Sequence, residues 1–294
     1  MNRKSIFLTL FAALLLAHAA PLRAQSTAAP TAKVAASATS GEKDWWKHAV
    51  VYEIYPRSFA DSDNNGIGDI NGITSKLDYL KNLGVNTIWI TPFFPSPQVD
   101  FGYDVSDYEN IDPMYGNLKD FDHLISEAKR RGIHVVLDFV VNHTSDKHAW
   151  FLDSKSSKDS AKRDWYIWRD GKAPGEPPNN WQSIFGTPAW TYDPATKQWY
   201  YHFFYPEQPD LNWRNPAVEK AMLDTMRFWF DRGVSGFRLD AVDTIYEDPN
   251  LKDNPFLPGT DNFGRPNMDH KFNTKLPEMH SANNPSAGSP ADRI

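Results

Sequence analysis

The sequence contains no cysteine, so an oxidising compartment would neither stabilise the chain through disulfides nor endanger it. It also lacks an excess of basic residues. The chain has 31 Lys and Arg residues and 37 Asp and Glu residues, which gives a formal net charge of -6. This negative charge argues against nucleic acid as a partner. Beyond the N-terminus, no apolar run is long enough to span a bilayer.

The N-terminal 43 residues have two compositions, and neither is typical of a folded domain. Arg3 and Lys4 precede an apolar run at 6–16, and small residues follow it, which is the pattern of a cleaved export signal. A membrane anchor is the alternative, although the apolar run is short for one. We therefore predict a signal peptide at 1–24 and a flexible linker at 25–43. The mature protein would be periplasmic or secreted and would have no contact with a membrane.

The remaining sequence has enough apolar residues for a substantial core, since 40% of the 294 residues are hydrophobic and 14% are aromatic. From residue 44 onward, short apolar runs alternate with amphipathic ones. Strand, helix, strand in this order indicates βα units with a parallel sheet and right-handed crossovers. The predicted strands are 50–55, 87–90, 134–139 and 236–240, and the predicted helices are 73–83, 118–131 and 216–232.

The alternation stops between residues 144 and 212. This stretch is polar, rich in proline and aromatic residues, and has no helical period. A loop of that length in a compact domain is either functional or a subdomain, and its aromatic content argues against disorder. We therefore expect an irregular excursion from the sheet. After residue 245 no further strand-like run is predicted.

A separate signal follows the predicted strand at 50–55. Between residues 61 and 69, oxygen-bearing side chains occupy alternate positions, with glycine at the sixth, as in a calcium loop in which the seventh residue offers its backbone carbonyl. Gly72 stands where an EF-hand has its bidentate Glu, so an EF-hand itself is disfavoured. A polar Asx-turn region is the alternative to an ion site. The predicted Ca²⁺ ligands are Asp61, Asp63, Asn65, Ile67 and Asp69.

The strand at 236–240 carries two charged residues at its far end. Residues two apart on a strand point the same way, so Arg238 and Asp240 share one face. An arginine beside a carboxylate lowers the carboxylate pKa and keeps the group ionised, the state that a carboxylate nucleophile needs. An ordinary salt bridge at a strand end is the alternative.

Three blocks in order, 100–108, 138–143 and 236–240, resemble the α-amylase family of glycoside hydrolases, in particular its α-glucosidase and oligo-1,6-glucosidase branch. The resemblance covers roughly residues 45–280. It implies a (β/α)8 barrel, of which about the first four βα units are present at 44–143 and 213–280. The excursion at 144–212 takes the position of the family's domain B. The resemblance also implies a calcium loop after the first strand.

The resemblance further assigns roles around the strand ends. Asp240 would be the nucleophile that forms the glycosyl-enzyme intermediate, and Arg238 would orient it. The first sugar subsite would be formed by Asp100, Tyr103 and His143, with Tyr103 as a stacking platform. Two looser matches add residues that either border this pocket or pack within the excursion, namely Phe185 and Gln208. Asp138 is either a scaffold residue or a direct sugar contact.

A retaining glycosidase also needs a carboxylic acid as proton donor, about 5–5.5 Å from the nucleophile. The family supplies it as a Glu at the end of the fifth strand, and no such strand is predicted here. Glu247 and Glu278 are the first alternatives to test. After residue 280 the resemblance stops, and 281–294 reads as an unrelated or truncated tail. We therefore expect the chain to be a truncated, inactive fragment, whether from a frameshift, an early stop or a misassembled gene.

Two functions from different classes are consistent with these residues. The first is a retaining, exo-acting α-glucosidase that hydrolyses maltose or short malto-oligosaccharides, with a small oligosaccharide as its partner. The alternative is a non-catalytic sugar-binding or interaction protein on the same scaffold. The presence of His143, Arg238 and Asp240 favours descent from an enzyme. Ala241, directly after Asp240, resembles the α-1,4-acting relatives more than the α-1,6-acting ones, which tend to carry a bulkier valine there, and this resemblance implies a preference for α-1,4 linkages.

Overall fold

A computed structural model describes residues 44–279 of the chain. The predicted signal peptide at 1–24, the linker at 25–43 and the tail at 281–294 lie outside the described residues, so these three remain predictions. Among the described residues, those from 46 to 279 belong to one compact unit. None of the helices between residues 44 and 279 is long and apolar enough to cross a membrane.

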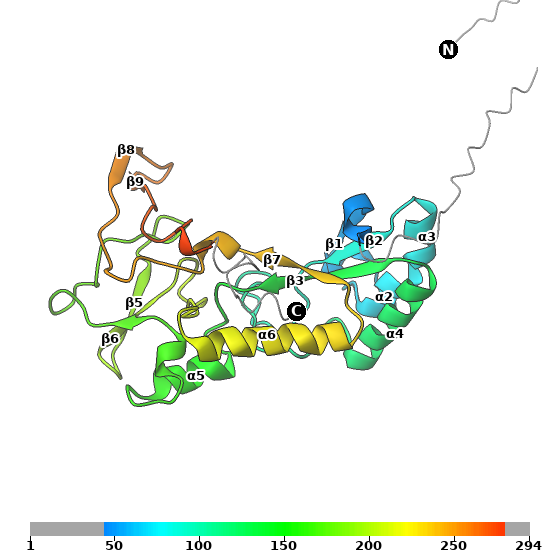
Figure 1. Cartoon of the computed structure of the whole chain (residues 1–294), viewed down its shortest axis with the longest axis horizontal. Coiled ribbons are helices and arrows are strands. Elements are labelled where there is room, and N and C mark those ends of the chain that lie inside the picture. The colour runs from blue at the N-terminus through cyan, green and yellow to red at the C-terminus, as the bar shows by residue number, and fades with distance from the viewer. Residues whose placement is uncertain (1–43, 280–294) are drawn as a thin grey trace, which may run out of the picture. The chain divides into compact units, whose positions relative to one another are not determined.

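A four-stranded parallel sheet organises this unit, in the order β1-β2-β3-β7 (Figure 1). Its strands are β1 (Val51–Ile54), β2 (Thr87–Ile90), β3 (His134–Val140) and β7 (Gly236–Asp240). The expected strands, their order and the parallel pairing are therefore confirmed. The register pairs Asp138 of β3 with Arg238 of β7, which sets the polar ends of the two strands side by side.

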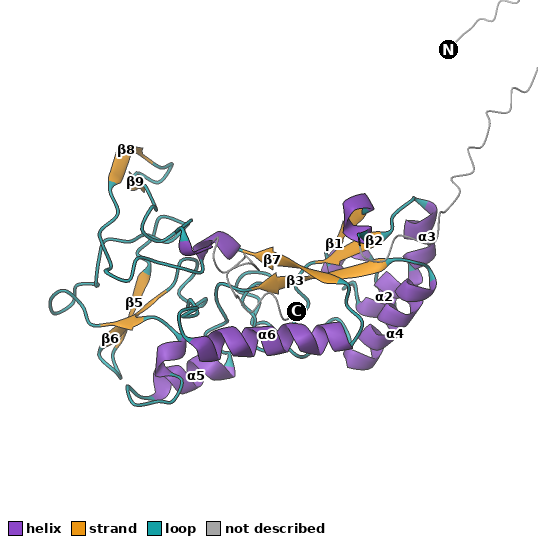
Figure 2. Cartoon of the chain, viewed as in Figure 1, coloured by secondary structure: helices purple, strands orange, loops and turns teal. Residues whose placement is uncertain are grey.

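Helices follow the strands and cover one face of the sheet (Figures 1 and 2). They are α2 (Ile70–Ser75), α3 (Leu77–Asn82), α4 (Leu118–Arg130) and α6 (Pro216–Asp231), with the short η1 (Trp45–His48) and α1 (Pro56–Phe59) at the start. A capping box between Asn117 and Asp120 fixes the start of α4. The prediction of one helix at 73–83 was wrong, because Asp69 caps a helix that begins earlier and the chain breaks at Lys76.

The excursion at 144–212 is more regular than its composition indicated. It contains one helix, α5 (Ala149–Ser156), and a turn of 3₁₀ helix, η2 (Arg163–Trp165). A small antiparallel sheet follows, in the order β4-β6-β5, from β4 (Trp168–Arg169), β5 (Trp190–Asp193) and β6 (Gln198–Tyr201). A helix therefore forms at α5 without a helical period in its sequence. Its hydrophobic residues do not concentrate on one face, so periodicity carried no signal there.

The segment after β7 also departs from prediction. It continues through η3 (Val242–Thr244) into an antiparallel hairpin of β8 (Phe256–Thr260) and β9 (Pro266–Met268), where no strand was expected. All five residues of β8 are exposed, so this strand has no buried apolar face that the sequence could reveal.

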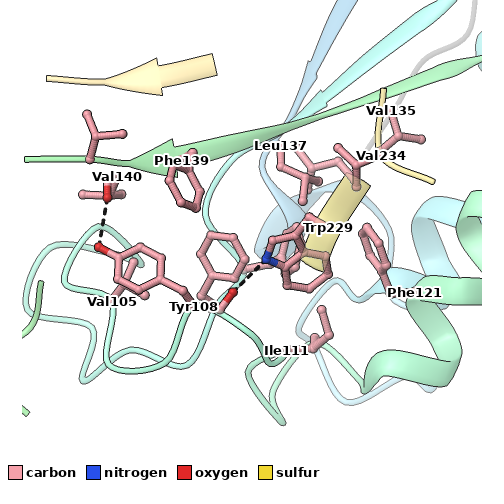
Figure 3. Close-up of a cluster of buried hydrophobic side chains, with 14 of the residues drawn as sticks. Val105, Tyr108, Ile111, Phe121, Val135, Leu137, Phe139, Val140, Trp229 and Val234 are labelled. Atoms are coloured by element: carbon pink, nitrogen blue, oxygen red, sulfur yellow. Dashed lines mark hydrogen bonds between the residues drawn. The ribbon is translucent and has the colours of Figure 1, made fainter. Parts of the chain in front are cut away.

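The main core lies between the sheet and its helices and is rich in aromatic rings (Figure 3). The indole of Trp229, on α6, packs edge-to-face on Phe93 and Phe121. Its Nε1–H donates to the carbonyl of Tyr108 at 2.8 Å. The Tyr108 hydroxyl in turn donates to the carbonyl of Val140 at 2.9 Å, at the end of β3. This core therefore anchors the strand end that carries the candidate site.

Candidate active site

Three charged side chains meet at the carboxyl ends of β3 and β7. Arg238 Nη1 donates to Asp138 Oδ1 at 3.2 Å and also to Asp240 Oδ1. The strand register places Asp138 beside Arg238, and the two-residue period of β7 places Asp240 on the same face. The predicted pairing of Arg238 with Asp240 is thus present, and Asp138 completes it.

The surroundings of Asp138 favour the scaffold alternative over direct sugar contact. Its side chain is 0% exposed, and its Oδ2 accepts hydrogen bonds from Trp89 Nε1 and from the Tyr103 hydroxyl, both at 3.2 Å. Burial raises the pKa of Asp138 to about 6, against the lowering effect of Arg238. Sequence reasoning missed Trp89. The two-residue period of β2, aligned with β3, could have placed it on this face.

Asp240 remains accessible, with 18% of its side chain exposed. Its pKa is raised from the ordinary value because burial disfavours the charged form, while Arg238 acts in the opposite direction. The expectation that Arg238 would leave Asp240 with a lowered pKa was therefore wrong. The sequence shows the arginine, but the extent of burial depends on how the excursion and the sheet pack together.

A second polar group lies where the excursion leaves and rejoins the sheet. The amide nitrogen of the buried Gln208 donates to Asp100 Oδ2 at 3.0 Å and lies 3.0 Å from His143 Nε2. Burial lowers the pKa of His143 to about 3, so the imidazole is neutral at ordinary pH. The structure thus brings Asp100, His143 and Gln208 together, and Gln208 also pairs within the excursion, where its Oε1 accepts the Tyr205 N–H. The Tyr103 hydroxyl reaches Asp138, which links this group to Arg238.

Backbone pairing holds the two ends of the excursion against each other. His143 and Asp210 form an antiparallel bridge, and the N–H of Leu211 donates to the carbonyl of Asn142 at 2.9 Å. The Tyr108 hydroxyl lies 2.7 Å from the carbonyl of His143 as well as near that of Val140, so its one proton is shared between these two acceptors. These contacts place Gln208 beside His143 although 65 positions separate them.

Aromatic rings continue from this group toward solvent. The ring centroid of Phe204 lies 4.9 Å from that of His143, and Phe185 stacks on Tyr205 at 4.3 Å. Phe185 also packs edge-to-face on Phe204, with ring centroids 6.3 Å apart, so it lies near the pocket through its neighbours. Its side chain is exposed.

A cleft of about 470 Å³ opens beside Asp240. The excursion supplies one wall, and the segments that follow β7 supply the other. Its lining residues are Ile184, Phe203, Phe204, Asp240, Ala241, Asp243, Thr244, His270, Thr274 and Lys275.

The two glutamates proposed as alternative proton donors are held elsewhere. Arg214 donates through Nη1 to Glu247 Oε1 at 2.8 Å and through Nη2 to Glu278 Oε2 at 2.6 Å. Burial raises the pKa of Glu247 to about 7, although Arg214 opposes the shift. Neither glutamate lines the cleft beside Asp240.

The loop at 61–69 gathers three carboxylates. One oxygen from each of Asp61, Asp63 and Asp69 lies within 4.8 Å of the others, a spacing that one Ca²⁺ with oxygen ligands at about 2.3–2.6 Å can bridge. The loop is also folded by Asx-type hydrogen bonds, such as those from the N–H groups of Asn64 and Gly66 to Asp61. This donor set of hard oxygens fits calcium. Asn65 Oδ1 accepts the Ile67 N–H, so these two residues close the loop as well.

Comparisons with known proteins agree with this geometry. The family model "Alpha amylase, catalytic domain" matches residues 53–286. The chain is 55% identical over 216 residues to a probable alpha-glucosidase of Rhizobium meliloti (strain 1021), which covers 74% of this chain and 39% of that protein. It is 56% identical over 202 residues to the oligo-1,6-glucosidase of Heyndrickxia coagulans, covering 69% of this chain and 36% of that protein.

Solved structures give the same result. The alpha-glucosyl transfer enzyme XgtA superposes with a TM-score of 0.76 at 48% identity, covering 80% of this chain and 45% of that one. The chain thus spans about two fifths of the length of the curated relatives that it matches. The four parallel strands are accordingly part of a (β/α)8 barrel. By the extent of the family match and by its fold, the chain belongs to the α-amylase family of glycoside hydrolases.

Proposed function

We propose that this chain carries the nucleophile and the glucose subsite of a retaining α-glucosidase. The observation that carries the proposal is the placement of Arg238 between Asp138 and Asp240, at the mouth of a cleft. Relatives described as an alpha-glucosidase and an oligo-1,6-glucosidase support it. Asp240 is the one member of the charged triplet that lines the cleft, so it is the group that a substrate reaches.

The arrangement assigns each side chain a step. An oxygen of Asp240 attacks the anomeric carbon, the bond to the leaving group breaks, and a glycosyl ester forms. Arg238 fixes the orientation of that oxygen through its hydrogen bond. Asp100, His143 and Gln208 hold the hydroxyls of the glucose unit, because their polar atoms converge beside the strand ends.

We propose that the proton donor is not among residues 44–279. Glu247 and Glu278 are both paired with Arg214 and lie outside the cleft. General acid catalysis typically contributes about 10²–10⁴-fold to such a reaction. We therefore propose that the 294-residue chain alone does not hydrolyse glucosides with poor leaving groups at a useful rate.

A substrate whose leaving group needs no proton tests the nucleophile by itself. In 5-fluoro-α-D-glucosyl fluoride, the bond between the anomeric carbon and its fluorine breaks, and fluoride leaves with the electron pair, so no acid is required. The fluorine at C5 stays on the sugar. We expect intact-mass and peptide mass spectrometry to find one fluoroglucosyl group on the peptide that contains Asp240. The Asp240→Asn variant should remain unlabelled. Asp243→Asn is the matched control, since Asp243 lines the same cleft, and it should still be labelled.

The alternative function, non-catalytic sugar binding on the same scaffold, predicts a different pair of results. Glucose would bind, as followed by calorimetry, but no labelled peptide would form at any time. Labelling that persists in Asp240→Asn would show that another residue is the nucleophile and would overturn the assignment.

The preference for the α-1,4 linkage rests on Ala241. Its backbone has φ of 47°, in the left-handed region that β-branched residues such as valine avoid, and it lines the cleft. A small residue leaves space for the leaving sugar, although a methyl-scale difference discriminates by only about 10–200-fold. Maltose should therefore bind more tightly than isomaltose, and the reverse order would reject this assignment.

Two further proposals concern a bound calcium ion and the export of the protein. Ca²⁺ would be held by the carboxylates of Asp61, Asp63 and Asp69, together with the Asn65 side chain and the Ile67 carbonyl. The ion would stabilise the loop that precedes α2 and would take no part in the chemistry. We also propose that the protein is exported, on the pattern of residues 1–24.

A further inference from the structure

The wall of the cleft opposite the excursion contains a lysine in an unusual setting. Lys275 lines the same cleft as Asp240, and its side chain is exposed. Its backbone N–H donates to the carbonyl of Asp243 at 2.7 Å, which ties the segment to the residues that follow the nucleophile. Lys275 has a φ of 55°, in the left-handed region that residues other than glycine seldom adopt.

The ammonium group of Lys275 is not used by the fold. No carboxylate lies within ion-pairing distance of it in residues 44–279, although Asp240 and Asp243 line the same cleft. The left-handed backbone of Lys275 is fixed locally by its hydrogen bond to Asp243, and its ammonium group has no ion-pair partner among the described residues that would hold it away from a molecule in the cleft.

The cleft adjoins the polar group formed by Asp100, His143 and Gln208 without including it. None of those three residues lines the cleft, whereas Phe204, which does, lies 4.9 Å from His143 between ring centroids. A glucoside with its anomeric carbon at Asp240 and its glucose unit among those three residues would have its leaving group in the cleft. The cleft volume of about 470 Å³ falls within the range of small-molecule sites, about 300–1,000 Å³.

We propose that Lys275 is a specificity-determining residue that donates hydrogen bonds to hydroxyl oxygens of the leaving sugar. Ile184 and Phe204, on the facing wall, would contact the apolar face of the same ring. The inference rests on the proposed function, because it takes Asp240 as the point of bond cleavage. The ligand class is a neutral hexose unit, since Asp240 and Asp243 offset the charge of Lys275 in the cleft.

The test compares ligands that fill the cleft with ligands that leave it empty. Maltose reaches into the cleft, whereas glucose and the fluoride leaving group of 5-fluoro-α-D-glucosyl fluoride do not. In Lys275→Ala, the dissociation constant for maltose should rise about tenfold, the effect of one charge-assisted hydrogen bond. The dissociation constant for glucose and the rate of labelling at Asp240 should stay within twofold of the unaltered chain, which also shows that the variant is folded.

Two controls complete the design. Lys271→Ala removes an exposed lysine whose ammonium lies 5.0 Å from the ring of Phe272 and which does not line the cleft, so maltose binding should not change. Lys275→Arg keeps a charged donor and should recover most of the affinity.

The outcomes separate this inference from the proposed function. Unchanged maltose binding in Lys275→Ala, with labelling intact, overturns the role of Lys275 and leaves the nucleophile assignment standing. Equal losses for glucose and maltose would place Lys275 outside the leaving-group subsite and overturn the inference as well. If the unaltered chain neither binds glucose nor becomes labelled, both the proposed function and this inference fail together.

Discussion

Burial and the ion pair with Arg238 shift the pKa of Asp138 in opposite directions. The pH dependence of the free energy of unfolding shows which effect is larger. Burial raises the pKa of Asp138 from 3.8 to about 6 in the folded chain. A raised carboxyl pKa means that the folded state binds the proton more tightly than the unfolded state does. The stabilisation is therefore fully present below about pH 4, decreases as pH rises through 6, and is absent above that.

The magnitude follows from the shift. About two pKa units correspond to roughly 3 kcal/mol, of which about 2–2.5 kcal/mol should appear between pH 7 and pH 4. We therefore expect the stability difference between the unaltered chain and Asp138→Asn to change by that amount in favour of the unaltered chain as pH falls. Urea unfolding of both proteins at each pH measures this difference, and a constant loss of hydrogen bonding in the variant cancels from it.

The opposite slope would refute the reasoning. If Arg238 outweighs burial, the folded pKa of Asp138 is depressed and the advantage of the unaltered chain shrinks on acidification. Asp170→Asn is the control for removing one negative charge, because the Asp170 side chain is 78% exposed. A flat difference would mean that neither effect dominates and would equally contradict the expected 2–2.5 kcal/mol.

Three other predictions address calcium, the polar pocket and export. A chelator should lower the melting temperature of the chain by about 5–10 °C, since an ion present at a hundred times its dissociation constant stabilises by about 2.7 kcal/mol, and Asp61→Ala should remove the response; identical melting curves would reject the ion site. Gln208→Ala should cost about 3 kcal/mol in urea unfolding, because it removes the partner of the buried His143 ring, of the half-buried Asp100 carboxylate and of the Tyr205 N–H that donates to Gln208 Oε1 at 3.2 Å; it should also weaken glucose binding. N-terminal sequencing of protein recovered outside the cytoplasm of a bacterial host should begin close to residue 20 or 25, whereas an intact Met1 would exclude cleavage.

Sequence patterns predicted the parallel strands well because each is short, apolar and bounded by polar or turn residues. The strands at 87–90 and 236–240 have the predicted ends. The patterns failed where local contacts decide the structure. The cap formed by Asp69 starts α2 ahead of the apolar period, and the exposed hairpin of β8 and β9 buries too little to leave a pattern.

The candidate site shows the same division. Arg238 and Asp240 share a strand face by simple parity, so their proximity was predictable. Gln208 and His143 are far apart in sequence and were brought together only through the family resemblance, since no periodicity relates them. The direction of the Asp240 pKa shift depends on burial by distant segments, which explains why an argument from the neighbouring arginine gave the wrong direction.

The backbone bridge between His143 and Asp210 closes the base of the excursion. The helix and small sheet beyond that bridge supply none of the polar group of Asp100, His143 and Gln208. They are nevertheless part of the main core, because Phe151, Trp168 and Tyr200 belong to its buried cluster. Removing residues 149–201 would therefore open the main core, and a shift of one residue at the bridge would separate Gln208 from His143.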